Sequence, residues 1–159
     1  EALVNGSSDL AALADVSQSV AVEFANTDYD PAQRAVALDA ALTNTSDKPI
    51  LGPIKVRVLS LRSGSAVPEV LEADNRLGGA GAVWDFTAQL SGAPLASMKL
   101  SAARTLSFRV SDLRPLAQGK DFKFSLFNID TRVFGKLHKE KSDKDEDKGE
   151  DSEEDKDEK

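Results

Sequence analysis

Apolar residues alternate with polar or small residues over most of the first 130 positions of this chain. In the segment 16–24, for example, Val20, Val22 and Phe24 each follow a less hydrophobic residue. A period of two is typical of β-strands with one face in a core and one toward solvent. The alternating segments are separated by Gly, Pro, Asn and Asp, which favour turns. The pattern predicts about seven short strands, at residues 16–24, 35–44, 54–61, 67–72, 82–87, 103–111 and 121–129.

Short strands joined by turns are typical of an antiparallel β-sandwich, so we expect an all-β fold. The strand at 67–72 contains Pro68, which lacks a backbone donor and favours an edge position. Before the strands, we expect residues 1–15 to contain a short helix, with Leu10 and Leu13 on one side. The sandwich itself is predicted to span residues 16–135.

The remaining segment, residues 136–159, is highly charged and contains no apolar residue after Leu137. It holds seven Lys and twelve Asp or Glu, and the whole chain has a net charge of −7. Such a segment buries too little apolar surface to offset its ordering entropy, so we expect a disordered tail. An acidic chain is a poor partner for nucleic acid, and no apolar run approaches the roughly 18 residues of a membrane span.

The supply of catalytic side chains is small, and we predict that the chain is not an enzyme. It has no Cys, and its one histidine, His138, lies in the charged segment. Asp28 and Asp30 are paired carboxylates, but they lie in a turn pattern, where Asp commonly hydrogen-bonds to the backbone. We expect no cofactor. Calcium held by loop oxygens is the open alternative, with candidate ligands Asp28, Asp30, Asp74 and Asn75.

The glycine-rich stretch "ADNRLGGAGAVWDF" contains the only tryptophan, Trp84. Glycine tolerates positive φ, so the stretch predicts a sharp turn into the strand at 82–87. Trp84 and Phe86 fall on one face of that strand, which favours a place in the core. The alternative is that Trp84 forms a platform for a sugar ring, which would make the chain a carbohydrate-binding module.

The outward faces of three strands suggest where a partner could bind. We suppose that the strands at 54–61, 103–111 and 121–129 are neighbours in one antiparallel sheet. One end of their outer face then carries a basic patch of Lys55, Arg57, Arg109 and Lys123. The other end carries an apolar patch, for which we expect a covering segment or a protein interface. The residues of this predicted interface are Leu59, Leu61, Phe127 and Ile129.

Three stretches resemble immunoglobulin-like or fibronectin-type sandwich domains of secreted and cell-surface bacterial proteins. They are "LTNTSDKPILGPIKVRVLSL", "EADNRLGGAGAVWDF" and "RTLSFRVSDLRPL", and the resemblance covers roughly residues 42–129. It implies an immunoglobulin-like sandwich that serves as a spacer, an adhesive unit or an appendage to an enzyme. It further implies a periplasmic, cell-surface or extracellular location. We therefore expect a non-catalytic accessory module whose partner is another protein domain or subunit.

Overall fold

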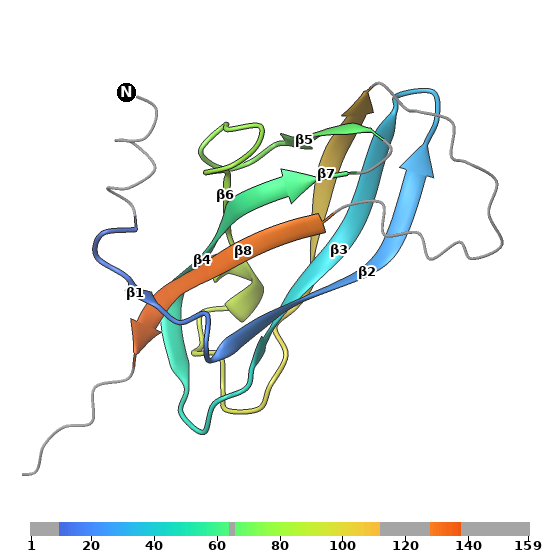
Figure 1. Ribbon diagram of the computed structural model, residues 1–159. Coiled ribbons are helices and arrows are strands. Elements are labelled where there is room, and N and C mark those ends of the chain that lie inside the picture. The colour runs from blue at the N-terminus through green and yellow to red at the C-terminus, as the bar shows by residue number, and fades with distance from the viewer. Residues whose placement is uncertain (1–9, 64–65, 112–127, 138–159) are drawn as a thin grey trace, which may run out of the picture.

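Two antiparallel β-sheets of four strands each make up the fold in the computed structural model (Figure 1). The structure describes residues 10–63, 66–111 and 128–137. These residues hold strands, turns and a single turn of 3-10 helix. The expectation of an all-β fold with two sheets is therefore confirmed.

The first sheet has the strand order β1-β8-β4-β6. The two long central strands, β4 and β8, are paired from Ile50 opposite Leu137 to Arg62 opposite Asn128. Gly135 in β8 faces the interior, and a Cβ there would lie 3.1 Å from Cγ2 of Ile50, so a larger residue would have to displace Ile50 by a few tenths of an ångström. The strands are β1 (Ala14–Asp15), β4 (Ile50–Arg62), β6 (Val83–Asp85) and β8 (Asn128–Leu137).

The second sheet has the strand order β2-β3-β7-β5. Its inner strands alternate between buried apolar residues and half-buried small or polar ones, as the period of two predicts. The strand that contains Pro68 lies at an edge, which confirms that prediction. The strands are β2 (Val20–Asp30), β3 (Ala35–Asn44), β5 (Val67–Leu71) and β7 (Arg104–Ser111).

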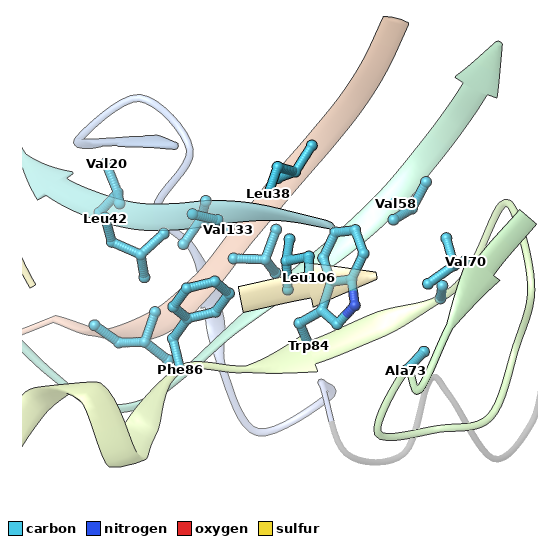
Figure 2. Close-up of a cluster of buried hydrophobic side chains, with 14 of the residues drawn as sticks. Val20, Leu38, Leu42, Val58, Val70, Ala73, Trp84, Phe86, Leu106 and Val133 are labelled. Carbon is cyan, nitrogen blue, oxygen red and sulfur yellow. The ribbon is translucent and has the colours of Figure 1, made fainter. Parts of the chain in front are cut away.

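The core lies between the sheets and contains the tryptophan. Trp84 on β6 and Phe108 on β7 pack edge to face, with ring centroids 5.9 Å apart and an angle of 77°. Phe86, at the start of the 3-10 helix η1 (Thr87–Leu90), is 1% exposed, like Trp84. Figure 2 shows both side chains among aliphatic residues of the two sheets. The predicted core position of Trp84 and Phe86 is confirmed.

The glycine-rich stretch is a turn that delivers the chain into β6. The side-chain amide of Asn75 donates to the carbonyl oxygen of Gly81 at 2.8 Å and accepts from the backbone N–H of Val83 at 3.0 Å. Gly81 has a φ of 89°, which L-residues rarely adopt. One asparagine side chain and one glycine conformation therefore fix the approach to Trp84.

Both ends of the predicted sandwich differ from expectation. Of residues 1–15, the described part forms a turn and then β1, which pairs with β8 instead of being helical. The last strand runs from Asn128 to Leu137, two residues past the expected end of the sandwich. It begins where the predicted strand at 121–129 ends, and residues 121–127 lie outside the described residues, as does the segment 138–159.

Candidate functional site

A polar cluster joins the two sheets where β7 begins. Arg104 donates from its guanidinium to the carboxylate of Asp74 and to the backbone oxygen of Asp85, both at 2.7 Å. The same carboxylate accepts the backbone N–H of Asp85 at 2.6 Å. The contact therefore ties the start of β7, in one sheet, to the end of β6, in the other.

The environment of Asp74 keeps its carboxylate ionised. Burial raises the pKa of Asp74, but hydrogen bonds from Arg104 and from the backbone of Asp85, with the charges of Arg104 and Lys55, outweigh it. The pKa of Asp74 consequently lies below its ordinary value. A carboxyl group with a lowered pKa is a poor proton donor near neutral pH, so Asp74 is suited to structural ion pairing and not to acid catalysis.

The cluster lines an open cavity of about 350 Å³. Asp85 accepts hydrogen bonds from the backbone N–H and the hydroxyl of Thr87, at 2.9 and 2.5 Å. The side-chain oxygen of Gln89 is buried and has no hydrogen-bond partner among the described residues. The cavity therefore offers hydrogen-bond acceptors. Its lining residues are Asp74, Asp85, Thr87, Ala88, Gln89 and Arg104.

The four candidate calcium ligands do not come together as a metal site among the described residues, and three of them form hydrogen bonds within the chain. Asp30 accepts the backbone N–H groups of Ala32 and Gln33, at 2.9 and 3.2 Å, and so shapes the turn after β2. Asp74 is paired with Arg104, and the amide group of Asn75 holds the glycine-rich turn. Within residues 10–63, 66–111 and 128–137, no group of three or more His, Cys, Asp or Glu side chains could hold a metal ion.

Two of the four residues of the predicted apolar interface do not face outward as expected, because β4 contains a β-bulge. The register with β8 shifts between Val58 and Ser60, so Leu59 is an extra residue and is 44% exposed. Beyond this bulge, Leu61 pairs with Ile129, and both pack against the core instead of facing outward. Leu59 alone remains exposed, and Phe127 lies outside the described residues.

The predicted basic patch is divided between the two sheets. Lys55 and Arg57 lie together on β4, but Arg109 lies on β7 in the other sheet, where it pairs with Glu69. The supposition that β4 and β7 are neighbours was therefore wrong, because periodicity fixes which face a residue occupies but not which strands pair. Lys123 lies outside the described residues.

The sequence analysis did not identify Phe24 and Tyr29, two exposed aromatic side chains on β2, as candidate site residues. Phe24 lies opposite the buried Ala40 of β3, and Tyr29 lies opposite the buried Val36, so both face the interior side of the sheet. Each is nevertheless 41% exposed. Alternation predicts the side that Phe24 occupies, whereas Tyr29 reaches the same side only through a register shift between Ala25 and Asp28. Neither pattern carries a signal of whether the other sheet covers these side chains. Trp84, the proposed sugar platform, is 1% exposed and offers no surface for stacking.

Comparison of the chain with known protein families, curated proteins and solved structures gives no match. The part of the chain that the structure describes contains no helix with the length and hydropathy of a membrane span.

Proposed function

We propose that this chain is a non-catalytic, immunoglobulin-like β-sandwich module that acts by protein–protein contact within an exported protein or assembly. The sequence layout of residues 42–129, which resembles bacterial surface domains, supports the type of module and its location. The ionised, paired state of Asp74 supports a structural role for the polar cluster. The contact surface is the open edge formed by β2.

The partly exposed interior side of β2 carries this proposal. Among the described strands, β2 is the outermost of its sheet, and it is 11 residues long (Figure 1). Val20, at its start, is 5% exposed, but Phe24 and Tyr29 are each 41% exposed further along. Within the described residues, the sheet therefore extends beyond its cover at this edge, with two aromatic rings on the side that elsewhere forms the core.

A partner strand alongside β2 would satisfy both features of this edge. It would hydrogen-bond to the backbone groups of β2 that pair with no described strand and place its own side chains against the two rings, as in recognition by β-strand addition. An aromatic side chain buries about 200 Å² on average, so about 160 Å² of the two rings is available. Burial of that area contributes at most about 4 kcal/mol, so the backbone hydrogen bonds and other contacts of the added strand must supply the rest of the affinity.

The experiment compares a double variant, Phe24→Ser with Tyr29→Ser, with the wild-type chain expressed in its native cells. Proteins that co-purify with the chain are quantified, and the unfolding free energy of each variant is measured. We expect the double variant to lose a partner without losing stability, because the two rings touch little of the core. Val67→Ser is the matched control, since Val67 is 54% exposed at the opposite edge, on β5.

Two outcomes contradict the proposal. If the double variant keeps every partner of the wild type, β2 is not the contact surface. If it unfolds several kcal/mol more easily and binds as before, Phe24 and Tyr29 are covered within the chain in solution.

A further inference from the structure

The outward faces of the two sheets carry opposite charge. The outward side of β1-β8-β4-β6, called here the basic face, carries five basic and three acidic residues on its strands. The outward side of β2-β3-β7-β5, the acidic face, carries five acidic residues and one arginine. The basic-face residues are Lys55, Arg57, Arg62, Arg132, Lys136, Asp15, Asp85 and Asp130. The acidic-face residues are Glu23, Asp28, Asp30, Asp39, Glu69 and Arg109.

The basic face holds an arginine, Arg57, that has no ion-pair partner within the described residues. Arg57 lies directly opposite Arg132 in the pairing of β4 with β8. Arg132 is paired with Asp15 at 2.9 Å, whereas no carboxylate among the described residues forms an ion pair with Arg57. Like charges directly opposite each other destabilise a sheet. An anionic group on a binding partner would relieve this repulsion.

The side chains of the two faces also differ in size. In the middle of the acidic face, several outward positions of β3 and β7 carry small side chains, such as Ala35, Ala37, Ala41 and Ser107, beside the longer Asp39 and Arg109. The basic face carries long side chains, including Arg57 and Lys136, with Leu59 exposed on its bulge. The small side chains leave room for such long side chains beside the carboxylate of Asp39.

We propose that copies of this chain associate face to face, with the basic face of one copy on the acidic face of the next. Each copy would use two different surfaces, so the association is heterologous and continues in a row instead of closing as a dimer. Arg57 and Lys136 of one copy would then lie near Glu23, Asp28 and Asp39 of its neighbour. The interior side of β2 stays free, so this association and the proposed strand addition can fail independently.

The size of the faces predicts a weak and salt-sensitive contact. With strands about 4.8 Å apart and a rise of about 3.3 Å per residue, the strand lengths give about 440 Å² for the basic face and about 540 Å² for the acidic face. A stable interface buries about 800 Å² on each partner, so charge has to supply much of the attraction. Association should therefore occur at low ionic strength and disappear as salt screens the charges.

The experiment measures the average mass of the full chain by sedimentation over a range of concentrations. The measurement is made at about 0.01 M salt, where the Debye length is about 30 Å, and at about 1 M salt, where it is about 3 Å. We expect the mass to rise with concentration at low salt and to return to the monomer value at high salt.

Two charge-reversed variants test the pairing of the faces. Arg57→Glu with Lys136→Glu leaves both faces acidic, and Glu23→Lys with Ala25→Lys and Asp28→Lys leaves both faces basic. Each variant alone should lose the association, and an equimolar mixture of the two should regain it. The mixture also shows that the variants are folded. Arg76→Glu with Lys99→Glu, in loops outside the strands of both faces, is the control with the same charge change as the first variant and should associate like the wild type.

A wild-type chain that stays monomeric at low salt overturns the proposal, and so does a mixture that associates no better than its components. Loss of association in the loop control would show that net charge, and not the two faces, governs the behaviour. If the wild type is monomeric while the amide signals of Arg57 and Lys136 move with salt, an acidic segment of the same chain occupies the basic face, and association between copies is excluded.

Discussion

Trp84 of β6 and Phe108 of β7 meet edge to face in the interior and so connect the two sheets, with ring centroids 5.9 Å apart. Each side chain is at most 1% exposed. The indole N–H of Trp84 has no hydrogen-bond partner among the described residues. The contribution of Trp84 to stability therefore comes from its packing.

Truncation of the Trp84 side chain should lower stability strongly, and its replacement by another aromatic ring should lower stability less. We expect Trp84→Ala to lower the unfolding free energy by about 3–5 kcal/mol, because it leaves a cavity between the sheets. Trp84→Phe should cost clearly less, since it keeps a ring beside Phe108 and removes an unpaired buried donor. Chemical denaturation followed by circular dichroism measures both. Native tryptophan fluorescence at the wavelength of an exposed indole would contradict the buried position.

The ion pair between Asp74 and Arg104 should make stability depend on pH. Because the pKa of Asp74 is lowered in the folded state, its ionised form stabilises the fold above its ordinary pKa of 3.8. That contribution is lost as the pH falls through the lower folded value. We expect Asp74→Asn to cost about 1–2 kcal/mol at neutral pH, a range that allows for solvent screening of the partly exposed pair.

We expect the unfolding free energies of the wild type and of Asp74→Asn, measured by denaturation from about pH 7 to about pH 2, to converge in acid. Glu69→Gln is the control, since its pair with Arg109 is 3.4 Å long and more than half exposed on both sides. It should change stability little at any pH. A difference between wild type and Asp74→Asn that stays constant down to the lowest pH would contradict the assigned role of Asp74.

The period of two in the sequence was sufficient to predict most of the strands and the core position of Trp84. It could not predict which strands are neighbours, so Arg109 was grouped with Lys55 and Arg57 although it lies in the other sheet. Nothing in "VRVLSLR" marks Leu59 as a bulge, yet that one extra residue turns Leu61 inward. Such features depend on the partner strand and not on the local sequence.

The polar cluster around Asp74 and Arg104 and the open edge formed by β2 also could not be predicted from the sequence. Asp74 and Arg104 are 30 positions apart, and only the packing of the two sheets brings them within 2.7 Å. Phe24 follows the same alternation as the buried Val20, and the difference in exposure depends on how far the opposing sheet extends. The local role of Asp30 in a turn was predictable, because Asp often accepts backbone hydrogen bonds at such positions.

Asn44 is buried, and both the NH₂ group and the oxygen of its side-chain amide are hydrogen-bonded. We expect the NH₂ group to be essential for stability. Its NH₂ group donates to the carbonyl oxygens of Lys48 and Leu95, at 2.8 and 2.9 Å, and its oxygen accepts from Ser46. We expect Asn44→Ala to cost about 2–3 kcal/mol, because buried carbonyl groups lose their donor.

Asn44→Asp should be at least as unstable as Asn44→Ala at neutral pH, since it places a carboxylate against the same two carbonyl oxygens. Ser46→Ala, which removes a half-buried hydroxyl, should cost much less. Thermal unfolding of the three variants measures the order of their stabilities. If Asn44→Asp is nearly as stable as the wild type, the NH₂ group of Asn44 is dispensable.

Relief of the repulsion between Arg57 and Arg132 should stabilise the isolated chain. We expect Arg57→Thr to raise the unfolding free energy at low salt by about 0.5 kcal/mol, because like charges no longer face each other across β4 and β8. The gain should shrink at about 1 M salt. Arg62→Thr is the control, since Arg62 has an exposed carboxylate partner, Asp130. A lower stability of Arg57→Thr at low salt would show that Arg57 contributes to the fold itself.

The most direct test of the proposed function is photo-crosslinking from the edge of β2 in intact cells that make the protein. A photoreactive phenylalanine analogue is placed at position 24 or 29, and at position 98 as the control, because Met98 is 70% exposed away from β2. Contact through β2 predicts one covalent product, larger than the chain, that is common to positions 24 and 29 and absent from position 98. No product from positions 24 and 29, or the same product from all three positions, would contradict the account.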